Sequence, residues 1–196
     1  PPSCDDGGLG IGAALYVYHH LLGNPRRRTP DFGDNIAFKG YCPPNSLIDK
    51  VINDIPSEVS VTRADNLADV VAQSLANGEI VGVFNGLAET GPRALGNRSI
   101  LADASVKRNW QKVNSIKNRE FWRPFAPACL SEKVNQIFED GPRKSPHMLF
   151  NYKVRGSEFP AITHIDKTAR VQSVEPNSGT LREILQYYYA KTSQPL

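Results

Sequence analysis

Residues 91–127 constrain this chain more than any other segment. They contain eight Lys or Arg residues but only two carboxylates, Asp103 and Glu120, in a stretch otherwise rich in Gly, Pro and apolar residues. Burying an unpaired charge is strongly unfavourable, so the fold must place these cations in water, beside a carboxylate or around an anion. The segment therefore predicts a phosphate-binding surface.

The rest of the chain has the composition of an ordinary globular protein. Its 196 residues suffice for one well-buried domain, or for one domain and part of another. It starts at Pro1 without a Met and ends at Leu196 without a polar tail, so we expect a piece of a longer protein. Because it has no apolar run long enough for a membrane span and no signal-peptide pattern, we expect a cytoplasmic protein with no membrane partner.

Charge and cysteine content do not by themselves indicate nucleic-acid binding or a cysteine-based site. The net charge of +3 is too small to indicate nucleic-acid binding by itself, so nucleic acid is not an expected partner. Cys4, Cys42 and Cys129 are far apart and form no CxxC pair. We therefore expect reduced thiols rather than a disulfide framework or a zinc site.

Hydrophobic periodicity and turn residues predict alternating helices and strands. The predicted helices cover residues 11–22, 65–77, 105–116, 131–140 and a last segment that starts with a capping box of Thr180 and Glu183. Asp65 and Ser105 are the predicted N-caps of the second and third helices. The predicted strands cover residues 80–84, which we expect to be buried, 147–154, 160–165 and 169–174. Helices and strands alternate while the strands gather late, so the predicted fold class is α+β (mixed α/β).

The loop of residues 89–99 follows the first predicted strand and is a candidate ligand site. Its candidate residues are two glycines, two arginines and a serine, namely Gly91, Gly96, Arg93, Arg98 and Ser99. Glycine lets the backbone approach a ligand closely, and guanidinium groups bind phosphate oxygens in two-point contacts. The loop contains no Walker motif. The alternative is a surface loop whose arginines are solvated or pair with Glu89.

A second basic segment, residues 117–124, follows the predicted helix 105–116. Lys117, Arg119 and Arg123 lie next to aromatic residues and a proline, where unpaired charge is costly. Glu120 could neutralise one of these cations, which is the alternative. Two basic segments that flank one helix are more easily explained by a polyanionic ligand such as a nucleotide.

A third candidate group lies near the C-terminus. In a strand His164 and Asp166 would share a face, from which they could orient a phosphate or a hydroxyl or support a metal, and Arg170 follows them. The alternative is a structural His–Asp pair. Ser145, in the run Lys144-Ser145-Pro146-His147, could reach a ligand or belong to an ordinary turn.

Together these segments resemble the carboxy-terminal part of the O-carbamoyltransferases, the family of the nodulation-factor and antibiotic carbamoyl-transfer enzymes. The similarity runs through most of residues 78–174, with several long motifs in the right order. The matching runs are Glu89-Thr90-Gly91-Pro92-Arg93-Ala94-Leu95-Gly96-Asn97-Arg98-Ser99-Ile100-Leu101, Ile116-Lys117-Asn118-Arg119-Glu120, Arg123-Pro124-Phe125-Ala126-Pro127, Ser145-Pro146-His147-Met148 and Pro160-Ala161-Ile162-Thr163-His164-Ile165-Asp166 with Thr168, Arg170 and Gln172.

The resemblance implies part of a two-domain enzyme. Residues 1–23 would be the tail of a transferase domain of the actin-like ATPase type, residues 24–60 a linker, and residues 61–196 a truncated domain like the threonylcarbamoyl-adenylate synthases (YrdC-like), with a mixed twisted sheet. The second domain would make carbamoyl-adenylate from ATP and carbamoyl phosphate. The first would transfer the carbamoyl group to a hydroxyl of a sugar-like or natural-product acceptor, nodulation factors included.

The resemblance also implies roles for single residues. The cations that would hold carbamoyl phosphate and the triphosphate are Arg93, Arg98, Lys117, Arg119 and Arg123. Glu120 and Asp166 would orient those cations or Mg²⁺, and Ser145, His164 and Arg170 would complete the pocket. Asp6 would match the acidic ligand of a divalent metal, expected to be iron, where Gly7 and Gly8 would line the adenylate phosphate.

Three departures from the family pattern are visible. Lys167 stands where the family usually has Gly in a His-x-Asp-Gly-Thr run, Trp122 stands where Phe is usual, and the chain stops before the family's Asn-Thr-Ser-Phe-Asn segment. We therefore expect this piece not to complete carbamoyl transfer by itself. The alternatives are a tRNA-modifying threonylcarbamoyl-adenylate synthase and a non-catalytic nucleotide- or RNA-binding module. The sequence leaves homodimerisation open.

Overall fold

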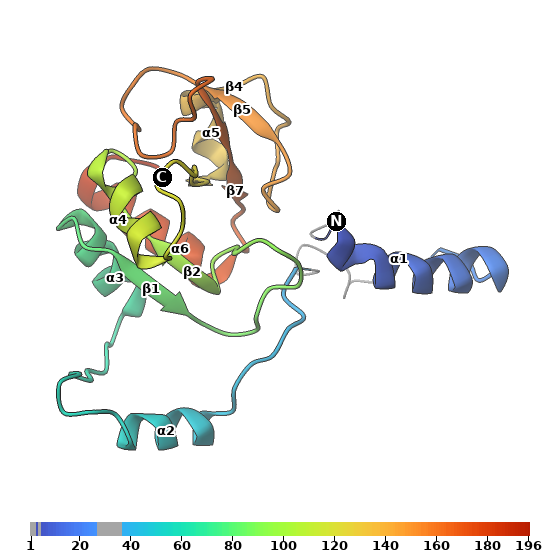
Figure 1. Ribbon diagram of the computed structural model, residues 1–196, viewed down its shortest axis with the longest axis horizontal. Helices are drawn as coiled ribbons and strands as arrows, with labels where there is room; N and C mark the ends of the chain where they lie inside the picture. The colour runs from blue at the N-terminus through green and yellow to red at the C-terminus, as the bar shows by residue number, and fades with distance from the viewer. Residues whose placement is uncertain (1–2, 4, 27–36) are drawn as a thin grey trace.

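Two helices that pack against each other form the centre of the fold (Figure 1). The computed structural model describes residues 3, 5–26 and 37–196. Helix α3 (Leu67–Ala76) carries small and branched apolar residues at helical spacing, and α6 (Gly179–Thr192) covers that face. The buried cluster between them consists of Ala68, Val71, Ala72, Leu75, Ile184 and Tyr188. This packing, rather than local propensity, stabilises both helices.

Strands β1 (Val81–Phe84) and β2 (Arg98–Leu101) form an antiparallel pair beside α3. Val81 and Leu101 pack against the α3–α6 cluster. Phe84 points the other way and is 70% exposed. The strand predicted for residues 80–84 is therefore present, but it is covered on one face only because a two-stranded sheet has no second layer here.

Two more small sheets lie in the C-terminal half. Strand β3 (Ala128–Leu130) pairs in parallel with β7 (Gln172–Val174). Strands β4 (Phe138–Glu139), β5 (Asn151–Val154) and β6 (Thr168–Arg170) form an antiparallel sheet. The 3-10 turn η4 (Ser131–Lys133) and helix α5 (Val134–Ile137) connect β3 to β4. A cluster that includes Cys129, Phe138, Tyr152 and Val171 forms the core of this half.

Helix α4 (Arg108–Ile116) lies between β2 and the second basic segment. Its buried residues are Asn109, Val113 and Asn114, so two of the three are polar. Ile116, at the end of the helix, is 59% exposed, although the apolar pattern of residues 106, 110, 113 and 116 predicts that it points inward. Ser105 does not cap this helix, because its hydroxyl donates to Asp103 Oδ1 at 2.6 Å instead.

The N-terminal region holds two helical pieces that make few contacts with the rest of the fold. The turn η1 (Asp6–Gly8), helix α1 (Leu9–Tyr16) and the π-helical turn η2 (Val17–Leu21) extend away from the other elements in Figure 1. They confirm the helix predicted for residues 11–22. Helix α2 (Asn45–Asn53) lies inside the predicted linker and was not predicted. Cys4 and residues 27–36 lie outside the described residues, and the proposed domain boundaries stay predictions.

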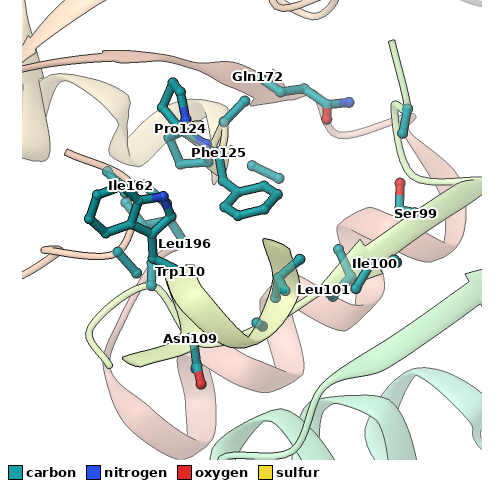
Figure 2. A pocket seen from close by; sticks show the side chains of 18 of the residues that line it. Ser99, Ile100, Leu101, Asn109, Trp110, Pro124, Phe125, Ile162, Gln172 and Leu196 are labelled. Carbon is teal, nitrogen blue, oxygen red and sulfur yellow. The ribbon is translucent and has the colours of Figure 1, made fainter. Parts of the chain in front are cut away.

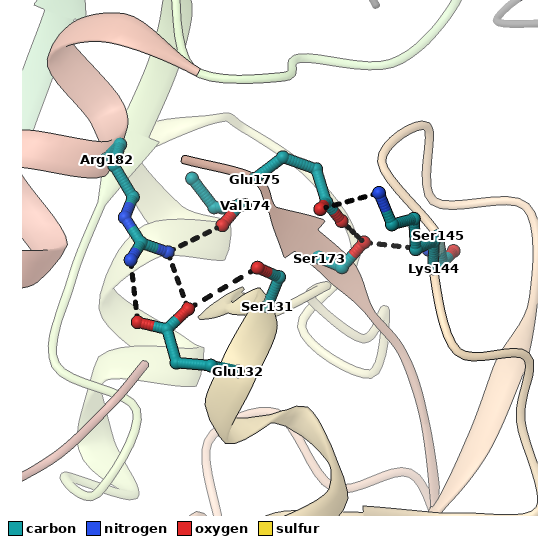
Figure 3. Close-up of polar contacts among 8 residues, drawn as sticks. All are labelled: Ser131, Glu132, Lys144, Ser145, Ser173, Val174, Glu175 and Arg182. Carbon is teal, nitrogen blue, oxygen red and sulfur yellow. Dashed lines mark hydrogen bonds and ion pairs between the residues drawn. The ribbon is translucent and has the colours of Figure 1, made fainter. Parts of the chain in front are cut away.

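A polar network fastens α6 to the C-terminal sheets (Figure 3). Arg182 of α6 donates to both carboxylate oxygens of Glu132 in η4, at 2.8 and 2.6 Å, and to the Val174 carbonyl at 3.0 Å. The bonds from Arg182 hold the pKa of Glu132 below its ordinary value, although burial acts in the opposite direction. Glu175 accepts from Ser173 and pairs with Lys144 at 3.2 Å.

Several predicted elements are wrong in detail. Residues 160–165 form turns rather than a strand, with the Phe159 carbonyl accepting bonds from Ile162 and Thr163. The helix predicted for residues 131–140 ends at Ile137, because Phe138 turns to extended backbone and pairs with Val154. The strand predicted for residues 169–174 is divided at Val171 between two sheets, and only residues 151–154 of the predicted 147–154 form a strand.

Two predicted caps are also wrong. Asn66, not Asp65, caps α3 by accepting from the Asp69 N–H at 3.1 Å. The Thr180–Glu183 box at the start of α6 does not form, because the helix starts at Gly179 and Thr180 therefore lies inside it, where Thr180 Oγ1 accepts a hydrogen bond from Asn85 Nδ2 at 2.9 Å.

The predicted class of mixed helices and strands is confirmed. Within the described residues the strands belong to three small sheets of two, two and three strands rather than to one mixed sheet. The YrdC-like assignment stays a prediction. Cys42 and Cys129 are free thiols, as predicted. None of the described helices combines the length and the apolar character that crossing a membrane requires.

Candidate anion-binding site

A cavity of about 750 Å³ opens between β2, α4, α6 and the segment that follows α4. Figure 2 shows Ser99 and Leu101 of β2, Trp110 of α4 and Phe125 around this space. Its apolar part is lined by residues from the helices and β2, namely Leu75, Leu101, Val113, Leu181, Ile184 and Leu185. Its basic part is lined by Arg93, Lys117, Arg119, Arg123 and Arg170. Among the described residues, the fold therefore brings five cations from three segments to one cavity.

Arg93, Arg119 and Arg170 form the centre of the basic part. Burial lowers the pKa of Arg170, and the positive charges of Arg93 and Arg119 lower it further. The Nε atoms of Arg119 and Arg170 are buried and have no hydrogen-bond partner among the described residues. In the same part of the chain, none of these three arginines forms an ion pair. Such a cluster is costly unless an anion enters it.

The carboxylates near the cavity do not neutralise this cluster. Asp103 is the one carboxylate among the described lining residues, and its Oδ1 accepts from the Ser105 N–H at 2.8 Å and from the Ser105 hydroxyl. Glu120 pairs with Arg123 at 3.5 Å, so it does contact one of the cations of its segment, which was the alternative prediction. Both side chains are about half exposed. Exposed pairs of this kind contribute little. Arg123 therefore keeps most of its capacity to bind an anion.

The loop of residues 89–98 is folded around an anion of its own. Glu89 Oε1 accepts hydrogen bonds from the backbone N–H groups of Leu95, Asn97 and Arg98 at 2.8, 2.9 and 3.1 Å. Burial raises the pKa of Glu89, but these bonds outweigh it and hold the pKa below its ordinary value. An arginine pair with Glu89 does not describe this arrangement, because the hydrogen-bond partners of Glu89 Oε1 are backbone amides.

The glycines and the serine of this loop differ in whether they face the cavity or serve the fold of the loop. Gly96 has φ +121° and lies so close to α6 that an added Cβ would come within 2.8 Å of Leu181. Gly91, with φ +106°, is exposed and does not line the cavity. Ser99 lines the cavity, while its Oγ accepts from the Gly96 N–H at 3.0 Å.

Arg98 does not line the cavity. Its guanidinium donates to the carbonyls of Asn85 (2.6 Å), Asn97 (2.9 Å), Gly86 (3.0 Å) and Tyr41 (3.2 Å). It also lies over the Phe84 ring, 3.6 Å from the centroid. Through these contacts Arg98 stabilises the backbone of neighbouring turns. Arg98 was predicted to bind phosphate together with Arg93, but of these two only Arg93 lines the cavity.

Comparison with known proteins assigns the chain to a family. The family described as "Carbamoyltransferase C-terminus" matches residues 72–196. The chain belongs to the carbamoyltransferase C-terminal family. The resemblance found in the sequence motifs is thereby confirmed. All five cavity cations lie within the matched residues.

Relatives of this carbamoyltransferase C-terminal chain include a nodulation protein and a cephem O-carbamoyltransferase. Nodulation protein NolO of Bradyrhizobium diazoefficiens is 37% identical over 205 residues, which cover 100% of this chain and 36% of that protein. The 3'-hydroxymethylcephem-O-carbamoyltransferase of Streptomyces clavuligerus is 41% identical over 110 residues, covering 56% of this chain and 21% of that protein. The chain spans about a third of the length of the curated relatives that match most of it.

The remaining predicted residues near the C-terminus lie outside the cavity lining, apart from Arg170. His164 and Asp166 are in a turn rather than a strand, where the Thr168 hydroxyl donates to Asp166 Oδ1 at 2.7 Å and lies 3.1 Å from His164 Nδ1. Burial lowers the pKa of His164, Asp166 raises it, and Arg170 lowers it further. Ser145 is buried, and its N–H donates to Ser173 Oγ at 2.7 Å. Roles for these residues stay predictions.

Asp6, Gly7 and Gly8 form the turn η1 at the start of α1. Asp5, not Asp6, caps this turn by accepting from the Gly7 N–H at 3.1 Å. Asp6 is exposed, and the described residues contain no group of three His, Cys, Asp or Glu side chains that could hold a metal. A metal at Asp6 would need further ligands, so this role and the phosphate role of the two glycines stay predictions.

No structural role was predicted for two polar residues at the cavity, Gln172 in its lining and Asn114 behind it. Gln172 donates from Nε2 to the Leu95 carbonyl at 2.9 Å and so ties the 89–98 loop to β7. Asn114 is fully buried in α4. A signal was available for Asn114, because a polar residue next to Val113 on the inner face of an amphipathic helix requires a hydrogen-bond partner.

Proposed function

We propose that this chain is part of an ATP-dependent O-carbamoyltransferase, in which the cavity binds ATP and carbamoyl phosphate and forms carbamoyl-adenylate. The observation that carries the proposal is the cluster of Arg93, Arg119 and Arg170, which are half-buried around the cavity without a described ion-pair partner. Membership of the carbamoyltransferase C-terminal family supports the chemistry. The acceptor is a hydroxyl of a sugar-like or natural-product molecule, a class that includes nodulation factors.

The five cations have a direct role in this chemistry. Water first cleaves carbamoyl phosphate into carbamate and inorganic phosphate. An oxygen of that carbamate then forms a bond to the α-phosphorus of ATP while the bond from the α-phosphorus to the leaving pyrophosphate breaks. Negative charge on the phosphate oxygens is held by Arg93, Arg119 and Arg170, with Lys117 and Arg123 at the exposed side. Donors fixed in a cavity that excludes water stabilise such charge more than the same donors do in water.

Magnesium is proposed to enter with ATP. The described lining offers Asp103 as its one carboxylate, and Ser105 already occupies Asp103 Oδ1. Mg²⁺ is commonly held by substrate phosphates and water with few protein carboxylates. Glu120 and Asp166 do not line the cavity, so we assign them no step in the reaction.

Calorimetric titration with ATP and Mg²⁺, with and without carbamoyl phosphate, tests this proposal. We expect the wild-type protein to bind. Arg170→Ala should bind at least tenfold more weakly, a loss of about 1.4 kcal/mol in binding free energy, because the variant removes one of the cavity cations. Arg155→Ala is the matched control, because Arg155 is exposed, pairs with Glu139 and does not line the cavity. Absence of binding by the wild type, or equal losses in both variants, would contradict the assignment.

A non-catalytic RNA-binding role is the second candidate. It is favoured by Phe121 and Trp122, which are 71% and 62% exposed next to the basic segment and could stack on bases. RNA binding depends steeply on salt and should be indifferent to carbamoyl phosphate. If RNA binds with a steep salt slope and carbamoyl phosphate does not compete, this candidate replaces the first.

A further inference from the structure

Three of the five cavity cations lie on a segment without regular structure. Residues 117–125 contain Lys117, Arg119 and Arg123 but form no helix and no strand. The backbone bonds of this segment are local, such as Arg119 N–H to the Asn114 carbonyl at 3.0 Å and Arg123 N–H to the Glu120 carbonyl at 3.2 Å. The segment therefore needs another anchor if its cations are to face Arg170 in a fixed arrangement.

The side chains of α4 provide that anchor. Asn114 Nδ2 donates to the Phe121 carbonyl at 3.1 Å and to the Arg123 carbonyl at 2.9 Å. Trp110 Nε1 donates to the same Arg123 carbonyl at 2.7 Å. Residues four apart lie on one face of a helix, so both donors point at the same stretch of chain. Both acceptors of Nδ2 are carbonyls, which fixes the orientation of the Asn114 amide.

Other contacts of the segment are weak by comparison. Phe121 and Trp122 are mostly exposed, so their rings do not hold it in place. The Glu120–Arg123 pair connects two residues of the same segment and is itself exposed. Phe125 packs against the C-terminal core and lies under Arg119, 5.3 Å from its guanidinium carbon, but it follows the last of the three cations. Between α4 and Phe125, the polar anchor acts on the middle of the segment.

We infer that Asn114 and Trp110 are positioning residues that set the anion affinity of the cavity by holding residues 119–123 against α4. Neither residue needs to touch the anion. Asn114 does not line the cavity, and the Trp110 indole N–H is directed at a backbone carbonyl. The inference rests on the proposed function for the identity of the ligand, but the anchoring itself is a property of the chain.

Two variants and one control test the inference. Asn114→Leu keeps the volume of the side chain and removes both donors, and Trp110→Phe keeps an aromatic ring and removes one donor. Tyr152→Phe is the control, because the buried Tyr152 also donates to a backbone carbonyl, that of Pro142 at 2.8 Å, but does so away from the cavity. All are compared below the onset of thermal unfolding, by titration with pyrophosphate and with MgATP and by amide hydrogen exchange without ligand.

We expect Asn114→Leu to exchange faster in residues 117–125 and to bind pyrophosphate about tenfold more weakly, with about a threefold loss in Trp110→Phe and no loss in Tyr152→Phe. Unchanged exchange in Asn114→Leu would overturn the inference, and so would faster exchange with unchanged affinity. If the wild type binds neither pyrophosphate nor ATP, the proposed function fails, while the exchange of residues 117–125 still decides whether the anchor exists.

Discussion

At the scale of single residues, Lys167 has a backbone conformation that lysine rarely adopts. Its φ is +63°, in the turn where its N–H donates to the His164 carbonyl at 3.0 Å. Its carbonyl accepts from the Val154 N–H at 2.9 Å, so the backbone of Lys167 joins the turn to β5. The glycine that the resemblance expects at this position would meet the same requirement without a Cβ.

Lys167→Gly should therefore stabilise the protein. Relief of the left-handed conformation outweighs the extra freedom of glycine in the unfolded chain, for a net gain of about 0.5 to 1 kcal/mol. The measurement is urea denaturation of the wild type and the variant. Lys167→Ala is the control and should gain nothing, since alanine keeps the Cβ. An equal gain in both variants would show that the lysine side chain, not the backbone, is the cause.

Arg93 and Arg98 show what sequence could and could not predict about the site. Both were expected to bind phosphate, since they lie in one loop with the same chemistry. Arg98 instead takes the carbonyls of residues 85–86 and of Tyr41, which is more than 50 positions away in the chain. The family resemblance placed Arg93, Lys117, Arg119, Arg123 and Arg170 in one pocket, and these five side chains do line one cavity, while their roles stay predictions. Whether an arginine donates to backbone carbonyls or faces the cavity depends on packing between segments that are far apart in the chain. The spacing of arginines within one loop does not predict that packing.

At the scale of elements, the contact between Gly96 and α6 fixes how the 89–98 loop sits on the helices. Gly96 is buried, and Leu181 occupies the space where a Cβ would be. Gln172 holds the preceding residue, Leu95, to β7. The loop, α6 and β7 therefore share one small contact that has no room for a side chain.

Gly96→Ala should destabilise the protein by about 3 kcal/mol, the sum of backbone strain and overpacking against Leu181. Gly78→Ala is the matched control. Gly78 also has positive φ, +80°, but an added Cβ would meet nothing within 4 Å. It should cost only about 1 kcal/mol, since strain is the remaining contribution. If chemical denaturation gave the same loss in the free energy of unfolding for both variants, Leu181 would have moved aside. The close contact with Leu181 would then contribute nothing to stability.

Helices were predicted better than strands for a physical reason. The hydrophobic periodicity that predicts the helices α1, α3 and α4 involves only residues that are close in the chain. Each of these predicted helices is matched by a helix in the structure. The strands are short, with two to four residues each, and pair across long separations such as Leu130 with Val174. A hydrophobic run such as residues 160–165 does not reveal from its sequence whether a partner strand is available. Among the described residues no strand pairs with this run.

At the scale of the whole molecule, the cation cluster links folding to ligand binding. Arg170 is half buried beside two like charges, an arrangement that opposes folding until an anion is present. A ligand that binds only the folded state adds RT ln(1 + [L]/Kd), which is about 2.7 kcal/mol at a hundred times Kd. The stability of this protein should therefore depend on phosphate-containing solutes.

Arg170→Met should separate the two effects. Without anion the variant should be as stable as the wild type or more stable, because a flexible apolar side chain of similar length replaces a poorly solvated cation. With pyrophosphate at a hundred times the wild-type Kd, the thermal midpoint of the wild type should rise, and that of Arg170→Met should rise by about half as much or less, because its binding is at least tenfold weaker. Arg155→Met, at an exposed ion pair, should keep the response of the wild type. A variant that responded as fully as the wild type would exclude Arg170 from the site.

The carboxylate of Glu89, which occupies three converging amides of the 89–98 loop, has a consequence for binding kinetics. A loop that encloses its own anion is ordered before any substrate arrives. The conformational entropy lost in ordering it belongs to folding and is not subtracted from the affinity for substrate. No slow closure of this loop has to precede or follow the encounter, so the rate of association through this side of the cavity should be set by diffusion and charge.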